Sequence, residues 1–102
     1  MHTDKEKLIE VIKAVEGVFT ISEKIIFVEL VKVSTDNQVV ITTKTLKELT
    51  SLSPTTVHTA LKFLQSKHYI KKIRRDIYEI SPKNVEYVMQ LYQLQKKYTN
   101  VG

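Results

Sequence analysis

The chain contains 102 residues, of which 42% are hydrophobic and 26% are charged, with only two glycines and two prolines. This composition is typical of a single globular domain spanning residues 1–102 and argues against a long disordered linker. Because cysteine is absent, a disulfide framework and a cysteine-based zinc site are excluded, and the three histidines, His2, His58 and His68, are not spaced as metal ligands. We therefore expect a fold stabilised by packing alone, with no metal and no cofactor.

The net charge of +5 is concentrated in one part of the sequence. Residues 1–43 carry five lysines against seven acidic residues, whereas residues 44–83 carry nine lysines and arginines against three acidic residues. A basic surface of this kind favours a polyanion, most often nucleic acid, because neutralised phosphates release condensed counterions. The alternative is a lysine-rich surface that serves solubility.

Neither a targeting segment nor a membrane segment is expected. Residues 1–10 lack the apolar run of a signal peptide, and no stretch approaches the roughly 18 apolar residues of a membrane span. We expect a cytoplasmic protein that does not bind membranes.

The first predicted element is an amphipathic helix. With Thr3 or Asp4 as its N-cap, apolar residues recur at helical spacing as far as Val15. Gly17 predicts the end of this helix, because glycine adopts the left-handed conformation without strain.

The second predicted element is a long apolar segment that ends at Val33. Ser22 provides an N-cap and Glu23 places an acid in the first turn, so we predict a central, buried helix. Its many β-branched residues leave a strand as the alternative.

Two segments predict a small sheet. Residues 39–42 form a short β-branched run after a polar turn at residues 36–37, and we expect this strand to pair with the second segment. That segment, residues 69–80, alternates between apolar and polar residues around a basic turn at residues 74–76. It predicts a two-stranded hairpin.

Between these segments lies a predicted helix-turn-helix. Thr45 with Glu48 has the capping-box spacing for the first helix, and Thr43 is the other candidate cap. We expect Leu46 and Leu49 of this helix to face inward.

The turn and second helix of this motif carry clear boundary signals. Leu52 falls in the turn, Ser53 caps the second helix, and Pro54 occupies its first position, where a missing N–H costs nothing. We predict that this helix continues to about Lys67. Its apolar face consists of Val57, Ala60, Leu61 and Leu64.

The last predicted helix covers residues 82–98 and repeats the start signal, with Ser81 before Pro82. It has two apolar stripes. The first consists of Val85, Val88, Met89 and Tyr92, and the second of Tyr87, Leu91, Leu94 and Tyr98. Two stripes exceed what one small domain needs, so the second is a candidate dimerisation surface. The alternative is that both pack within the chain.

The helix-turn-helix suggests which residues contact DNA. In this motif the N-terminal part of the second helix meets base edges in the major groove, while the first helix crosses the backbone. Hydroxyl and cationic side chains suit these contacts, and arginines of a hairpin suit the flanking backbone or a narrow minor groove. The candidate DNA-binding residues are Lys44, Ser53, Thr55, Thr56, His58, Thr59, Lys62, Lys72, Arg74 and Arg75.

Several of these residues also have a purely structural interpretation. Thr55 and Thr56 suit the first turn of any helix, and Arg74 and Arg75 suit a solvated hairpin turn. His68 falls where the second helix must end, so we interpret it as a terminator rather than a ligand.

The order of these residues resembles a known superfamily pattern. The matching residues are Leu46, Leu49, Leu52-Ser53-Pro54-Thr55-Thr56-Val57, Ala60-Leu61, Leu64 and Lys67-His68-Tyr69-Ile70. This run is similar to that of bacterial winged helix-turn-helix regulators, including MarR-like and GntR-like proteins. Residues 22–85, with the ending Tyr78-Glu79-Ile80-Ser81-Pro82, resemble the RepL-type replication initiators of small bacterial plasmids. The usual glycine after the recognition helix is His68 here.

The resemblance implies a mainly helical winged-helix fold with a small β-sheet, and a protein that binds double-stranded DNA. We expect a small, dimeric transcriptional regulator. A replication-initiator or copy-control protein that binds a plasmid or phage origin is one alternative, and a winged-helix module for protein assembly is another. An enzyme is not expected, since no nucleophile–base set or paired carboxylates are visible. The sequence does not indicate whether a small-molecule effector exists.

Overall fold

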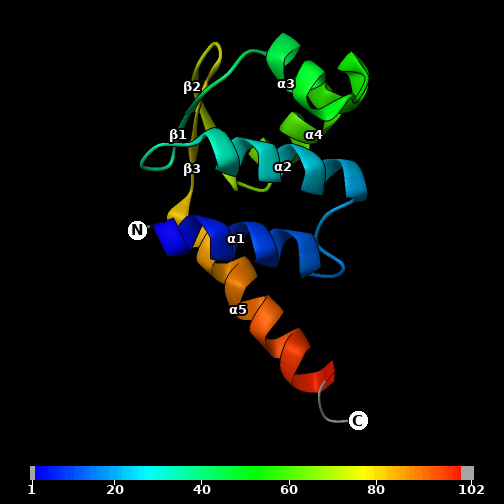
Figure 1. The fold of residues 1–102 in the computed structure, drawn as a ribbon, viewed down its shortest axis with the longest axis vertical. Coiled ribbons are helices and arrows are strands. Elements are labelled where there is room, and N and C mark those ends of the chain that lie inside the picture. Colours follow the sequence, from blue (N-terminus) through cyan, green and yellow to red (C-terminus); the bar gives the residue numbers. More distant parts are fainter. Residues whose placement is uncertain (1, 100–102) are drawn as a thin grey trace.

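The structure, a computed structural model, describes residues 2–99, with side chains for residues 5–98. In order, the elements are α1 (His2–Ala14), α2 (Ile21–Val33), β1 (Gln38–Val40), α3 (Thr43–Thr50), α4 (Pro54–Ser66), β2 (Ile70–Arg74), β3 (Ile77–Ile80) and α5 (Pro82–Thr99). The α3–α4 pair, α2 and α1 lie in successive layers, with the sheet along one side and α5 beneath α1 (Figure 1). This mainly helical arrangement with a small sheet confirms the predicted winged-helix fold.

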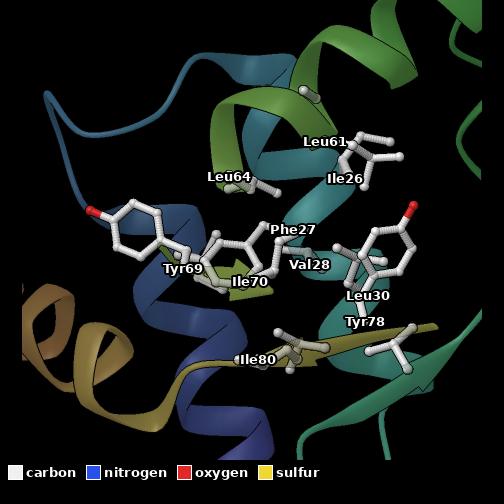
Figure 2. Packing of buried hydrophobic residues seen from close by; sticks show 14 of the residues in the cluster. Ile26, Phe27, Val28, Leu30, Leu61, Leu64, Tyr69, Ile70, Tyr78 and Ile80 are labelled. Atoms are coloured by element: carbon white, nitrogen blue, oxygen red, sulfur yellow. The ribbon is translucent and has the colours of Figure 1, made fainter. Parts of the chain in front are cut away.

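α2 forms the centre of the core, which confirms the predicted helix over the alternative strand. Ile26, Phe27 and Leu30 are fully buried, and α2 packs against both α1 and α4. Figure 2 shows how side chains from α2, α4 and the sheet meet around Phe27. Fully burying side chains of this size contributes about 1.5–3 kcal/mol each, so α2 holds the two helical layers together.

The boundaries of α1 and α2 differ from the predicted caps. α1 begins at His2, so Thr3 and Asp4 lie inside it. The chain reverses after α1 at Gly17, which has a φ of 79°.

α2 is capped by Thr20 rather than Ser22. The Thr20 Oγ1 accepts from the Glu23 amide at 3.2 Å, while the Glu23 carboxylate accepts from the Thr20 amide at 2.9 Å. This reciprocal capping box satisfies two amides, whereas Ser22 would satisfy one.

The predicted details of α3 need two corrections. Its N-cap is Thr42, whose Oγ1 accepts from the Thr45 amide at 3.0 Å, rather than Thr45 or Thr43. Leu46 is fully buried, but Leu49 is 53% exposed and does not face inward. The reason is that α3 has only eight residues and meets the core along a narrow stripe that Leu46 fills.

The sheet has the strand order β1-β3-β2, and all its pairs are antiparallel. Val39 of β1 pairs with Tyr78 of β3, which confirms the predicted pairing of the first strand with the hairpin. A bulge at Ile73 shifts the register of β2, and the turn that follows contains Arg75 and Asp76. Arg74, which we predicted in the turn, is therefore the last residue of β2.

α5 starts at the predicted Ser81-Pro82 signal, with the Ser81 Oγ accepting from the Asn84 amide at 3.4 Å. It crosses beneath α1, and its C-terminal half extends away from the body of the protein (Figure 1). Gln95 of α5 makes two hydrogen bonds to Glu16, which follows α1. Its Nε2 donates to the Glu16 carbonyl at 2.8 Å, and its Oε1 accepts from the Glu16 amide at 2.9 Å. The path of α5 is thus fixed at both ends.

Candidate nucleic-acid interface

The turn between α3 and α4 sets the angle at which α4 is presented. Ser51 ends α3 in the left-handed conformation, with φ of 62°, and its amide donates to the Lys47 carbonyl at 2.8 Å. Ser53 caps α4 as predicted, because its Oγ accepts from the Thr56 amide at 3.2 Å and donates to the Thr56 Oγ1 at 2.8 Å. These bonds hold the first turn of α4 in a fixed position.

α4 has one buried and one exposed face. Val57, Ala60, Leu61 and Leu64 are buried as predicted. On the opposite face, Thr55, His58, Thr59 and Lys62 are exposed at helical spacing. Side chains at these spacings lie on one side of a helix, so all four can meet the same surface.

A groove separates α4 from the hairpin of β2 and β3, hereafter the wing. It has a volume of about 370 Å³. The lining residues are Thr42, Thr43, Lys44, His58, Leu61, Lys62, Gln65, Lys72, Arg75, Asp76 and Tyr78. The groove thus joins three segments that are distant in the sequence: the start of α3, the middle of α4 and the wing.

The groove brings together half of the predicted DNA-binding residues. Lys44, His58, Lys62, Lys72 and Arg75 line it. The others lie outside its lining: Ser53, Thr55, Thr56 and Thr59 are in the first part of α4 or its cap, and Arg74 is exposed on β2.

Six residues of the lining were not predicted as site residues: Thr42, Thr43, Leu61, Gln65, Asp76 and Tyr78. Gln65 follows Lys62 by three residues on α4, and this helical spacing could have included it. For Tyr78 the alternation of the wing indicates only a buried strand residue, and nothing local reveals that its hydroxyl reaches a groove.

The charge of the groove is strongly positive. Lys44, Lys62, Lys72 and Arg75 face it, and the acidic residue in its lining is Asp76. None of the four cations forms an ion pair with another residue in the part of the chain that the structure describes. They are therefore available to an anionic partner.

A second hollow, of about 540 Å³, lies at the free edge of β2. It is lined by Gln65, His68, Ile70, Lys71, Lys72, Glu79, Ser81, Pro82 and Asn84. With two lysines against Glu79 it suits a polyanion less well than the groove, although it is larger. His68 adopts the left-handed conformation here, with φ of 64°, and its carbonyl accepts a hydrogen bond from Asn84 Nδ2. The prediction that His68 ends the helix is confirmed.

Among the side chains of residues 5–98, no group of three or more His, Asp or Glu is placed to hold a metal ion. Among the same residues, no helix combines the length and the apolar character needed to cross a membrane.

The three-helix core, the helix-turn-helix and the wing define a winged-helix protein. Residues 4–101 match the family of Firmicute plasmid replication proteins, RepL, and the chain belongs to this family. The predicted resemblance to RepL-type proteins is thereby confirmed. Comparisons with curated proteins and with solved structures gave no significant match.

Proposed function

We propose that this protein binds double-stranded DNA at the replication origin of a plasmid, and that it acts by binding rather than by catalysis. The observation that carries the proposal is the groove between α4 and the wing, whose four cations have no ionic partner in the described chain. Membership of a plasmid replication family supports an origin as the target, in preference to the promoter expected from the sequence alone.

The exposed face of α4 suits the major groove of DNA. Thr55, His58 and Thr59 carry short donors and acceptors that can reach base edges, and Lys62 follows one turn later. The wing then lies over the adjacent backbone, where Lys72 and Arg75 meet phosphates. α4 thus provides sequence discrimination and the wing provides affinity.

The test is a comparison of two labelled duplexes by fluorescence anisotropy, one with the plasmid origin and one with its scrambled sequence. His58→Ala should reduce the preference for the origin, because a base contact contributes about 1–3 kcal/mol of discrimination. Arg75→Ala should weaken binding to both duplexes equally, because a phosphate contact carries no sequence information.

Ser66→Ala is the matched control, since Ser66 is exposed at the far end of α4 and its hydroxyl bonds only the Phe63 carbonyl. It should bind as the wild type does. If the wild type bound neither duplex at low salt, the proposed function would be wrong. Equal losses on both duplexes for His58→Ala would contradict its role at a base.

We further propose that two copies pair through α5. Tyr87, Leu94 and Tyr98 are 61%, 53% and 76% exposed, and with the half-buried Leu91 they follow the 4-3-4 spacing of a coiled-coil seam. Exposed apolar side chains in such a row are typical of an interaction surface. A two-fold dimer would place two copies of α4 about one DNA turn apart on a palindromic site.

Sedimentation analysis of the wild type and two variants tests this pairing. Leu94→Glu should yield a monomer, because a charge would be buried in the seam without a partner. Gln93→Glu, which adds the same charge at an exposed neighbouring position, should remain a dimer. A monomeric wild type at the concentrations that saturate DNA would refute the pairing.

A further inference from the structure

Tyr78 occupies an unusual place in the groove. It lies on β3, the central strand, between Val39 of β1 and Lys72 of β2, and it is only 5% exposed. Its ring rises from β3 on the side of Leu61, and its hydroxyl points away from the strand (Figure 2). Tyr78 also lines the groove together with Leu61. The hydroxyl is therefore directed into the groove floor.

This hydroxyl has no hydrogen-bond partner in the described part of the chain. Because no buried side-chain oxygen of the described residues lacks a partner, this hydroxyl must be open to the groove, where water or a ligand can accept its hydrogen bond. The groove around it is lined by three cations, Lys62, Lys72 and Arg75, and by one acidic residue, Asp76. The excess of positive charge favours an anion there, and a bound anion can accept from the hydroxyl while the cations attract it.

The start of α3 adds to the same environment. Thr43 and Lys44 occupy the first turn of α3 and line the groove. First-turn amides have no acceptor within their own helix, and the helix dipole favours negative charge there. The groove therefore combines the first turn of α3, the cations and the Tyr78 hydroxyl.

We propose that the groove contains a phosphate site, in which the Tyr78 hydroxyl donates a hydrogen bond to one phosphate, and Lys62, Lys72 and Arg75 attract that phosphate and its neighbours along the backbone. This inference rests on the proposed function, since it takes the phosphate to be one of the DNA backbone. It assigns to Tyr78 a role in binding that goes beyond its packing in the sheet.

The ionisation of Tyr78 agrees with a donor role. Burial, and to a smaller extent the nearby Asp76 carboxylate, raises the pKa of Tyr78 above its ordinary value of 10.0. The phenol is thus neutral at every pH at which DNA binding is normally measured, and a neutral phenol can donate to a phosphate oxygen.

Tyr69 provides a matched control within the same core. It is 8% exposed, and burial raises its pKa as well. Its ring lies on the other side of Phe27 from that of Tyr78 (Figure 2), and Tyr69 does not line the groove. Tyr78→Phe and Tyr69→Phe therefore remove the same atom from two buried rings, of which one faces the groove.

The first experiment measures the affinity of both variants for the origin duplex over a range of salt concentrations. Tyr78→Phe should bind about tenfold more weakly at every salt concentration, because a hydrogen bond to a charged acceptor is lost. The dependence of affinity on salt should be unchanged, since a neutral hydroxyl releases no counterion. Tyr69→Phe should bind as the wild type does. If Tyr78→Phe bound within about twofold of the wild type while Arg75→Ala bound more weakly, the phosphate site would be refuted and DNA binding would stand.

The second experiment identifies the phosphate. Duplexes that carry one uncharged methylphosphonate are tested at each backbone position in turn. At one position the substitution should weaken the wild type but cause no further loss in Tyr78→Phe, because both changes remove the same contact. Losses that add at every position would contradict a direct contact.

Titration with inorganic phosphate at constant ionic strength tests the site without DNA. Saturable shifts of the Thr43 and Lys44 amide resonances, lost in Tyr78→Phe, would show that the groove binds phosphate by itself. If the wild type failed to bind DNA but showed these shifts, the proposed function would be wrong and the ligand would be a free phosphate compound. Absence of both DNA binding and shifts would refute the phosphate site as well.

Discussion

Replacing Lys62 by glutamine should reduce the salt dependence of DNA binding by one phosphate contact. Five exposed cations face the DNA in the proposed complex: Lys44, Lys62, Lys72, Arg74 and Arg75. Each contact contributes about −0.9 to the slope of log affinity against log salt, so five contacts predict a slope of about −4.5 per protomer. A fourfold rise in salt should then weaken the wild type about 500-fold and Lys62→Gln about 150-fold.

Fluorescence anisotropy with the origin duplex at several potassium chloride concentrations measures both slopes. Lys13→Gln is the control, because Lys13 is exposed on α1, which α2 separates from α4 (Figure 1). It removes the same charge without removing a contact, so its slope should equal that of the wild type. If the wild type and both variants bind as dimers, all three slopes double and their order is unchanged. A wild-type slope near zero, or an equal slope for Lys62→Gln, would refute the assignment of Lys62 to a phosphate.

Three further predictions concern stability. Phe27→Ala should lower the free energy of unfolding in urea by about 3–5 kcal/mol, because a fully buried ring is lost from the centre of the core; a loss below about 1 kcal/mol would contradict its central place. His68→Gly should leave the free energy of unfolding unchanged or raise it by up to about 1 kcal/mol, since glycine adopts the left-handed conformation without strain. A clear loss of stability on chemical denaturation would show that the His68 side chain contributes to folding. Burial raises the pKa values of Tyr69 and Tyr78, so their contribution to stability should be complete below about pH 10 and be lost as the pH rises through the raised values. Between about pH 10 and the raised pKa values, the double variant with phenylalanine at both positions should lose less stability than the wild type, as measured by urea unfolding at each pH. Equal losses in the two proteins would show that these tyrosines do not cause the pH dependence.

Much of the fold follows from short-range patterns in the sequence. The helical spacing of Val57, Ala60, Leu61 and Leu64 identified the buried face of α4, and the two Ser-Pro pairs marked the starts of α4 and α5. Gly17 and His68 were correctly interpreted at helix ends. These features are local, because a cap or an apolar stripe depends on residues within a few positions of each other.

The errors arose where neighbouring residues compete for one structural role. Ser22 has the side chain of a cap, but Thr20 with Glu23 satisfies two amides instead of one. Leu49 has the spacing of an inward residue, but α3 is too short to bury more than Leu46 fully. The outcome depends on contacts with α2 and α4, which the spacing of the residues does not contain.

By itself the sequence determined the order of the elements, the location of the basic segment and most of the buried faces, because these follow from hydrophobic periodicity and from charge. Only the tertiary structure decided which charges meet. Lys44, Lys62 and Arg75 come from α3, α4 and the wing, and the pairing of β3 with both β1 and β2 brings them to one groove. The same pairing directs the hydroxyl of Tyr78 into that groove, since the central strand fixes where its side chains point.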